Sequence, residues 1–375
     1  MPRKKIITLF GIGSFLQDMG AEIIYPIWPF FVTSFAGASL VVLGFLDGLG
    51  DAIVALSQVA SGYLSDKTGR RKVFIWTGYS LGGLSRIGYA LASSWQWLIP
   101  FRILDRVGKI RGAPRDAMVA DESTEKDRGA NFGFLRAMDN FGAVVGITLS
   151  IILVFLLPLT TIFLVAAIPS LIAAAMIFFF VKEKKGGNGV WKKISFKGWG
   201  KPIWLFFAST AFLSLAAFSY SFLLLYVSRR EFSIPQTIVL YLFYSLVAAV
   251  FSLPFGRLAD KIGRKKVLGV GIGFYIASLS AFYYISFWIG WIAFTLYGLY
   301  KAAVEPVQKA FVSELAPKQT RGSALGGFQL IVGLLALPAS LLAGFLWNSF
   351  GDWAFITAAI VLCIASVATL YFVKE

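Results

Sequence analysis

Three residues near the N-terminus combine reactive side chains with helical spacing. Asp18, Glu22 and Tyr25 stand at i, i+4 and i+7, which places them on one face of a helix. Their surroundings are apolar, so two interpretations are open. A carboxylate here binds a proton or a cationic group during function, or it forms a buried ion pair with Arg102 or Arg106 that only holds helices together.

The same spacing recurs in two later apolar stretches. The members of each stripe share one helix face, and they are Arg102, Asp105, Arg106 and Lys109 in the first and Tyr297, Lys301 and Glu305 in the second. Lys301 and Glu305 can neutralise each other within one helix. Alternatively, Lys301 contacts an anionic group of a substrate or the acids of another helix.

Further charges lie in apolar stretches outside these stripes. Asp47 and Asp51 share a helix face, and we expect Arg86 and Arg136 to be their structural partners. Asp139 is a further candidate for proton binding. A charge at the centre of a membrane helix costs about 3 kcal/mol, whereas a typical protein is stable by only about 5 to 15 kcal/mol. Several such charges facing lipid would together exceed that stability. These side chains must therefore pair with one another or line water.

The composition is that of a polytopic membrane protein. Hydrophobic residues make up 58% and charged residues 14% of the 375-residue chain, which is more apolar surface than a soluble core absorbs. A membrane-spanning helix needs roughly 20 apolar residues. The sequence therefore predicts an all-α integral membrane protein with about twelve transmembrane helices. The predicted spans are 6–34, 40–64, 73–93, 96–118, 129–154, 158–181, 202–228, 234–258, 267–286, 288–312, 321–346 and 353–373.

The formal net charge is +16, but the lysines and arginines lie mainly in alternate loops. This distribution follows the positive-inside bias, so it predicts that both termini are cytoplasmic and argues against a nucleic-acid partner. The apolar stretch after Met1 is too long for a cleavable signal peptide and indicates a signal anchor. The chain has no histidine and one cysteine, Cys363. We therefore expect no resident metal, no cofactor and no internal disulfide, and any proton coupling must use carboxylates.

One charged turn is present twice. Two glycines, an aspartate and an arginine recur in the same order, and 256 − 62 and 263 − 69 both equal 194. These residues are Gly62, Asp66, Gly69 and Arg70 in the first turn and Gly256, Asp260, Gly263 and Arg264 in the second. The first glycine of each turn lets the next helix approach closely, and the second can adopt the left-handed conformation that reverses the chain. The duplication predicts an N-terminal bundle (1–181), a cytoplasmic linker (182–201) and a C-terminal bundle (202–375).

The pattern G-x-x-x-D-[RK]-x-G-R-[RK] of both turns resembles the signature loop of the major facilitator superfamily (MFS) of secondary transporters. The resemblance implies two six-helix bundles in the same orientation, related by an axis along the membrane normal. It also implies that the first, fourth, seventh and tenth helices line a central cavity, and that the aspartates and arginines of the turns steady the inner gate. The motifs around Asp18 and Arg106 look like a prokaryotic branch of predicted permeases.

The resemblance implies secondary active transport of a small solute across the cell membrane by alternating access. We expect protonation of buried carboxylates to be the coupled step, and efflux of an organic compound is one possible direction. Two features depart from the drug–proton antiporters of the family. The fifth helix has Gly142 and Gly146 without the usual glycine-proline element, and the fourth-helix arginines do not follow the R-x-x-x-G register. We expect a monomer whose partners are the solute, protons and the bilayer.

Three other functions explain fewer features of the sequence. A divalent metal cation held by Asp18, Glu22 and Asp105 is the main alternative cargo, although equally many buried bases argue against it. An intramembrane enzyme could use Asp47 and Asp51 as a magnesium–diphosphate site, but the chain lacks the denser aspartate motifs of such enzymes. A non-transporting scaffold does not need two signature turns. We therefore do not expect an enzyme.

Overall fold

The computed structural model describes residues 3–124, 127–182, 198–317 and 320–373. This described part is helical and contains no strand, as long apolar stretches predict. Within it, 10 helices or helix pairs are long and apolar enough to span a membrane. The expected spans 73–93 and 96–118 are helical too, but they are more polar and fall outside those limits. Most of the predicted linker 182–201 lies outside the described residues.

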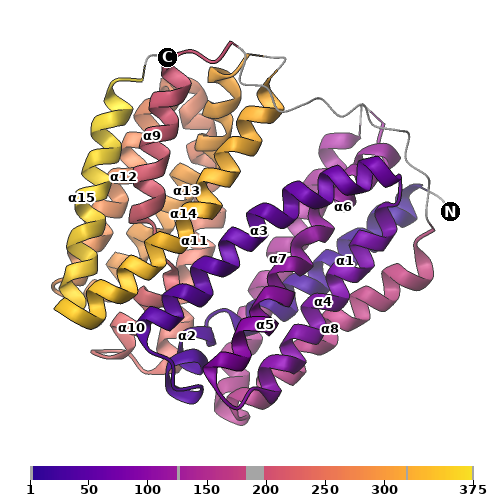
Figure 1. Ribbon diagram of the computed structural model, residues 1–375, viewed down its shortest axis with the longest axis horizontal. Coiled ribbons are helices and arrows are strands. Elements are labelled where there is room, and N and C mark those ends of the chain that lie inside the picture. Colours follow the sequence, from indigo (N-terminus) through magenta and orange to yellow (C-terminus); the bar gives the residue numbers. More distant parts are fainter. Residues whose placement is uncertain (1–2, 125–126, 183–197, 318–319, 374–375) are drawn as a thin grey trace. The chain divides into compact units, whose positions relative to one another are not determined.

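The chain divides into two compact units, whose helices are labelled in Figure 1. Unit 1 comprises Met1–Ala38 and Ile53–Lys192, and unit 2 comprises Ser39–Ala52 and Lys193–Glu375. The long helix α3 (Leu40–Thr68) has its first part in unit 2 and its remainder in unit 1. The other helices of unit 1 are α1 (Arg3–Ile24), α2 (Trp28–Phe30), η1 (Phe31–Phe35), α4 (Arg71–Leu91), α5 (Trp95–Val107), η2 (Gly108–Arg111), α6 (Gly112–Glu122), α7 (Arg128–Leu156) and α8 (Leu159–Phe180). Those of unit 2 are α9 (Lys201–Ala216), α10 (Tyr220–Ser228), α11 (Ile234–Ile262), α12 (Arg264–Phe282), α13 (Phe287–Leu315), α14 (Arg321–Phe350) and α15 (Asp352–Tyr371).

Helix packing repeats between the units. In unit 1, α1 packs against α7 and α8, while α4 packs against α8 and α5. In unit 2, α9 packs against α14 and α15, while α12 packs against α15 and α13. Each pair in one unit thus has its counterpart, in the same chain order, in the other. The duplication seen in the turns extends to the packing of the helices.

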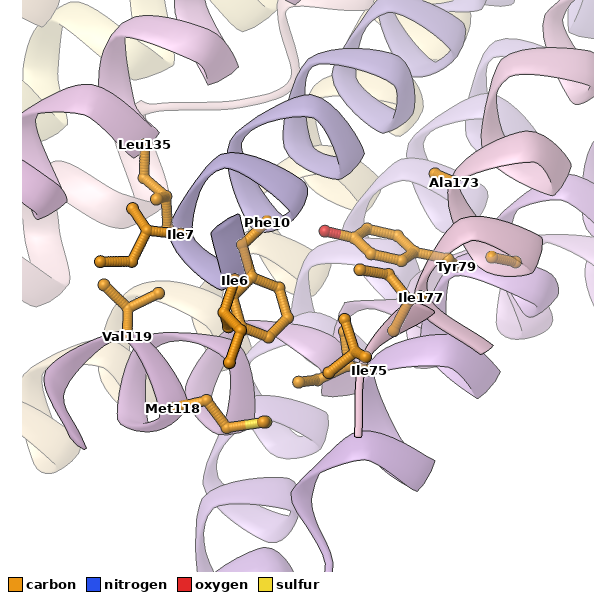
Figure 2. Close-up of a cluster of buried hydrophobic side chains, with 12 residues drawn as sticks. Ile6, Ile7, Phe10, Ile75, Tyr79, Met118, Val119, Leu135, Ala173 and Ile177 are labelled. Carbon is orange, nitrogen blue, oxygen red and sulfur yellow. The ribbon is translucent and has the colours of Figure 1, made fainter. Parts of the chain in front are cut away.

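A cluster of apolar side chains joins five helices of unit 1 (Figure 2). Phe10 of α1, Tyr79 of α4 and Ile177 of α8 are completely buried, and Val119 of α6 and Leu135 of α7 complete the contact between these helices. Because lipid tails are as apolar as these side chains, the cluster stabilises the bundle mainly through close van der Waals packing. It fixes the first half of α1, on which Asp18 lies two turns beyond Phe10.

Two glycines of α7 bring its backbone against α1. A Cβ atom on Gly142 would lie 2.4 Å from the carbonyl oxygen of Phe15, and one on Gly146 would lie 2.3 Å from that of Met19. Only glycine fits at such distances, and this small-residue spacing is typical of tightly packed membrane helices. The contact holds α1 on both sides of Asp18, which lies between Phe15 and Met19.

Two spans predicted as single helices are interrupted at equivalent positions. The first consists of α1, which ends at Ile24, and α2, which begins at Trp28; the seventh consists of α9, which ends at Ala216, and α10, which begins at Tyr220. Since 216 − 24 and 220 − 28 both equal 192, the breaks match in the duplicated chain. Pro26 and Pro29 explain the first break, because proline lacks a backbone N–H.

The fourth predicted span is also interrupted, by the short 3₁₀ segment η2 between α5 and α6. At this point the backbone touches α4, since a Cβ atom on Gly108 would lie 2.8 Å from the carbonyl oxygen of Gly78. A 3₁₀ turn has three residues per turn rather than 3.6, so it rotates the residues that follow it relative to the stripe on α5. The tenth span, α13, is continuous.

Candidate functional site

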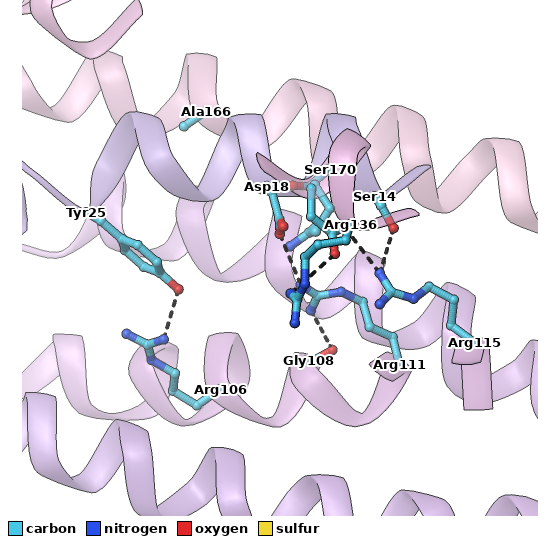
Figure 3. A network of polar contacts seen from close by, with 12 residues as sticks. Ser14, Asp18, Tyr25, Arg106, Gly108, Arg111, Arg115, Arg136, Ala166 and Ser170 are labelled. Atoms are coloured by element: carbon cyan, nitrogen blue, oxygen red, sulfur yellow. Dashed lines mark hydrogen bonds and ion pairs between the residues drawn. The ribbon is translucent and has the colours of Figure 1, made fainter. Parts of the chain in front are cut away.

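Asp18 pairs with Arg111, not with the expected Arg102 or Arg106 (Figure 3). The carboxylate lies 4.0 Å from the guanidinium, and its side chain is 29% exposed while that of Arg111 is 7% exposed. Arg111 is also held by the Gly108 carbonyl, to which it donates at 2.9 Å, and by the Tyr79 ring at 5.2 Å. Among the described residues, Asp18 has no other ion-pair or hydrogen-bond partner. Its carboxylate is therefore held by one long contact to a firmly anchored cation.

The basic stripe of α5 binds the segment after the break in α1. Arg106 donates a hydrogen bond of 2.9 Å to the Tyr25 hydroxyl, as Figure 3 shows, and its Nε lies 3.6 Å from the Asp105 carboxylate. The guanidinium of Arg102 lies 4.4 Å from the centroid of the buried Trp28 ring. Cation–π contacts of this kind are worth about 2 kcal/mol when desolvated. These arginines therefore tie α5 to the interrupted first span.

Glu22 of the first stripe and Lys109 of the second are half-buried. The Cβ of Glu22 lies 3.0 Å from the position that a Gly146 Cβ would take, which places Glu22 against α7. Lys109 lies in η2, beyond Arg106. Among the described residues, its ammonium forms no hydrogen bond or ion pair.

Asp139 belongs to a second network, between α1, α6 and α7. Its carboxylate lies 3.5 Å from Arg115 and 3.8 Å from Arg136. Arg115 also donates to the Ser14 hydroxyl at 2.6 Å and to Asp116 at 2.9 Å. Two cations from different helices thus share this one carboxylate, and the negative charge of Asp18 also acts on it.

The partners predicted for Asp47 and Asp51 are wrong, because both arginines bind elsewhere in unit 1. Arg136 pairs with Asp139, and Arg86 is 1% exposed and binds α8 and α1. Arg86 donates to the carbonyl of Ala166 at 2.8 Å, to the Ser170 hydroxyl and to the carbonyl of Gln17 at 3.5 Å. It joins three helices through backbone acceptors, which sequence spacing does not reveal.

Asp47 instead lies at the break in the seventh span, within unit 2. Its side chain is 3% exposed and accepts hydrogen bonds from the hydroxyls of Ser219 at 2.7 Å and Ser221 at 2.6 Å. The Ser219 oxygen in turn accepts from the Ser221 backbone N–H and so caps α10. Glycines hold α3 in place here, since a Cβ atom on Gly44 would lie 2.1 Å from the Ser340 carbonyl oxygen. This site was not predicted from the sequence. The signal for it was the duplication offset of 192, which transfers the break expected at Pro26 to the seventh span.

In unit 2, Lys301 and Glu305 pair with each other. The ammonium lies 3.0 Å from the Glu305 carboxylate and 5.8 Å from the centroid of the Tyr297 ring. Tyr297 is buried and packs against Tyr244, with 5.1 Å between ring centroids. Of the two interpretations, the self-neutralising pair is the one that this geometry supports.

The two signature turns have the same ion-pair geometry. Arg71 contacts both Asp66, at 3.4 Å, and Asp121 of α6. Arg264 contacts both Asp260, at 3.4 Å, and Glu314 of α13. In each unit, one arginine therefore bridges the end of the second span to the end of the fourth. In the first turn the bridging residue is Arg71 rather than Arg70, which is exposed at the start of α4.

The second glycine of each turn adopts the predicted conformation. Gly69 and Gly263 have φ angles of +64° and +98°, in the region that favours glycine. A Cβ atom on Gly62 would lie 3.6 Å from that of Ala113, which is an ordinary contact with α6 and not the predicted close approach of the next helix, α4. No described atom lies within 4 Å of the corresponding position at Gly256, where the predicted close approach is wrong.

The acids do not gather into a metal site. Within the described ranges, no group of three or more histidine, cysteine, aspartate or glutamate side chains could hold a metal ion. Asp18, Glu22 and Asp105, the ligands expected for a divalent cargo, therefore do not converge. Asp18 and Asp105 each face an arginine instead.

Known proteins are similar to this chain along most of its length. An uncharacterized MFS-type transporter of Methanocaldococcus jannaschii is 38% identical over 98% of this chain and 94% of its own length. A Na⁺, Li⁺, K⁺/H⁺ antiporter of Planococcus maritimus is 23% identical over 92% of this chain and 90% of its own. The crystal structure of the nucleoside transporter NupG superposes with a TM-score of 0.80 at 13% identity, covering 98% of this chain and 97% of that one. The family model of the Major Facilitator Superfamily matches residues 10–243 and 205–375. With duplicated bundles, two signature turns and these matches, the chain belongs to the Major Facilitator Superfamily of membrane transporters, which are not enzymes.

Proposed function

We propose that this transporter couples movement of a small solute across the cell membrane to protons, by alternating access. In this scheme the two bundles, 1–181 and 202–375, rock around a midplane site and are joined by the linker 182–201. The first part of α3 belongs to unit 2 and moves with the second bundle. Both termini face the cytoplasm in this scheme. Export of an organic compound is the direction that we would test first.

The Asp18–Arg111 contact is the observation that carries the proposal. A nearby cation favours an ionised carboxylate, whereas burial without that cation favours the protonated form. The contact is 4.0 Å long, and the carboxylate is 29% exposed, so a small movement of α1 relative to η2 removes the cation from Asp18. Asp18 then takes up a proton from water, and it releases the proton when the pair re-forms.

The breaks in the helices supply places for that movement. The backbone of α1 ends at Ile24, six residues beyond Asp18, and Arg111 lies in the 3₁₀ segment η2. Arg106, near the end of α5 just before η2, binds the hydroxyl of Tyr25, the residue that follows α1. A solute that moves Tyr25 would therefore shift the end of α1 and, with it, the distance between Asp18 and Arg111. The proton-coupled antiporter of Planococcus maritimus supports coupling by analogy.

The bridges of the signature turns would steady one conformation. Arg71 joins the ends of α3 and α6, and Arg264 joins those of α11 and α13. Such networks exchange partners at little energetic cost because they are partly exposed. We therefore assign gating to Gly62, Asp66, Gly69 and Arg71, and to Gly256, Asp260, Gly263 and Arg264.

Proton movement across the membrane of reconstituted vesicles tests the proposal. Purified protein is reconstituted with a pH-sensitive dye in the lumen, and a panel of metabolites and drugs is added outside. We expect at least one solute to change the lumenal pH with wild-type protein and with the surface variant Lys201→Gln. The double variant Asp18→Asn, Glu22→Gln should lose this response. A response that is unchanged in the double variant would remove both acids from the mechanism.

A further inference from the structure

Lys109 differs from the two bases beside it on the fourth span. Arg106 and Arg111 donate to groups of the chain itself, namely a tyrosine hydroxyl and a backbone carbonyl. Lys109 is half-buried, and within the described part of the chain its ammonium makes neither a hydrogen bond nor an ion pair. Asp105, one turn earlier, attracts it only from beyond contact distance, because that carboxylate lies against Arg106. A charge inside a membrane span needs a partner or water. The ammonium of Lys109 is therefore available to water or to a group from outside this chain.

The second half of the duplicated chain contains a counterpart of Lys109 that has a carboxylate partner. Lys301 corresponds to Lys109, because 301 − 109 equals the offset of 192 that relates Pro306 to Pro114. The partner of Lys301 is Glu305, 3.0 Å away, and subtraction of 192 from 305 leads to Ala113.

Ala113 is where the two halves diverge. Its Cβ lies 3.6 Å from the position that a Gly62 Cβ would take, so the residue at position 113 packs against the signature turn. The alanine leaves Lys109 without a carboxylate four residues later, which is the position from which Glu305 pairs with Lys301.

The charged residues around Lys109 leave a net positive charge. Bases exceed acids in the spans of unit 1 that carry this network, so a positive potential remains after the internal pairs are made. The bases are Arg86, Arg102, Arg106, Lys109, Arg111, Arg115 and Arg136, and the acids are Asp18, Glu22, Asp105, Asp116 and Asp139. A neutral or cationic solute would leave this excess uncompensated.

We propose that Lys109 binds the anionic end of the transported solute, a carboxylate or a phosphate carried by a small organic molecule. The inference rests on the proposed transport function and names its substrate class. The ammonium supplies a charge-assisted hydrogen bond to the anion. Arg106 and Arg111 remain bound to Tyr25 and Asp18 and add to the positive field. Binding of the anion therefore takes place beside the Asp18–Arg111 contact.

Thermal unfolding of the detergent-purified full chain tests the proposal with matched pairs of probes. The pairs are benzoate and benzamide, succinate and succinamide, and phenyl phosphate and phenol. Ligands that bind the folded state raise the unfolding temperature. We expect at least one acid, but not its neutral partner, to stabilise the wild type and the variants Lys109→Arg and Lys201→Gln. In Lys109→Gln the apparent affinity for that acid should fall about tenfold or more.

Each alternative outcome counts against the proposal. Neutral probes that stabilise as well as their acids would overturn it, as would a set of acids that does not distinguish wild type from Lys109→Gln. A lipid headgroup is the other source of a phosphate, so the measurement is repeated in nanodiscs of phosphatidylglycerol or phosphatidylcholine. If only phosphatidylglycerol gives stabilisation that depends on Lys109, the bound anion is a lipid and the substrate assignment is wrong.

The two proposals fail separately. Acid binding that depends on Lys109 is an equilibrium property and needs no pH gradient. If it persists while the Asp18→Asn, Glu22→Gln variant still moves protons with solute, the substrate class stands and the coupling scheme does not. If acid binding is absent but the coupling response depends on the two carboxylates, the coupling scheme stands and the substrate class does not.

Discussion

The Ser219 hydroxyl donates a hydrogen bond of 2.7 Å to the carboxylate of Asp47, which is 3% exposed. This bond, with that of Ser221, joins α3 to the point where the seventh span is interrupted. The same bond explains why no proline or glycine is needed at the break. A side chain from another helix stabilises the free end of α10, as a cap does within one helix.

Replacement of Asp47 should therefore destabilise unit 2. Asp47→Ala leaves two buried hydroxyls without their acceptor, and we expect a loss of about 1 to 3 kcal/mol in the free energy of unfolding. Asp47→Asn keeps one acceptor oxygen and should lose less. Thermal unfolding in detergent measures both, with Glu231→Ala at an exposed position of unit 2 as the control. Equal losses for Asp47→Ala and Glu231→Ala would contradict the structure.

The glycines of α7 make a second prediction. Gly142→Ala would push a methyl group against the Phe15 carbonyl, and overpacking of this kind costs about 1 to 3 kcal/mol. On the same helix, Gly133 has no described atom within 4 Å of its Cβ position. Gly133→Ala should be neutral or stabilise by up to about 1 kcal/mol, because alanine favours helix. The unfolding temperatures of the two variants should therefore shift in opposite directions or differ clearly in size.

The first signature turn predicts different roles for neighbouring arginines. Arg71→Ala removes the bridge between Asp66 and Asp121, whose side chains are partly exposed, and should lower stability by about 1 kcal/mol. Arg70→Ala removes an exposed residue and should change stability by less than about 0.5 kcal/mol. Chemical denaturation of both variants under identical conditions checks the order. A larger effect of Arg70→Ala would show that the bridge is assigned to the wrong residue.

The Asp18–Arg111 pair should respond unequally to the loss of either member. Asp18→Asn leaves Arg111 bound to Gly108 and Tyr79, so we expect a change below about 1 kcal/mol. Arg111→Gln removes the hydrogen bond to Gly108 and the contact with the Tyr79 ring as well as the pair, so we expect a larger loss of about 1 to 3 kcal/mol. Thermal melts of the single and double variants give the coupling energy of the pair. Equal effects would mean that Arg111 is not anchored independently.

The general fold was predictable because it depends on local properties of the sequence. Apolar length gives the spans, and the repeated turns give the duplication. The positive φ angles of Gly69 and Gly263 follow from the need to reverse the chain within a few residues. Pro26 likewise indicates the break after α1.

The partners of the buried charges were less predictable, because they depend on irregular backbone. The stripe on α5 assumed an unbroken helix, and η2 rotates Arg111 toward Asp18 instead. Arg86 binds a backbone carbonyl of α8, and backbone acceptors are present at every residue. Asp47 reaches a helix break that has no proline or glycine of its own. In each case the deciding contact is tertiary.

Infrared spectroscopy of the full chain in bilayers tests the central claim most directly, because the stretching band of a protonated carboxyl group is distinct from that of a carboxylate. Spectra are compared at mildly acidic and mildly alkaline pH. We predict a protonated-carboxyl band that grows on acidification in the wild type and in the exposed control Glu231→Gln, and that is clearly smaller in Asp18→Asn. A band of the same size in Asp18→Asn would show that Asp18 does not carry the proton.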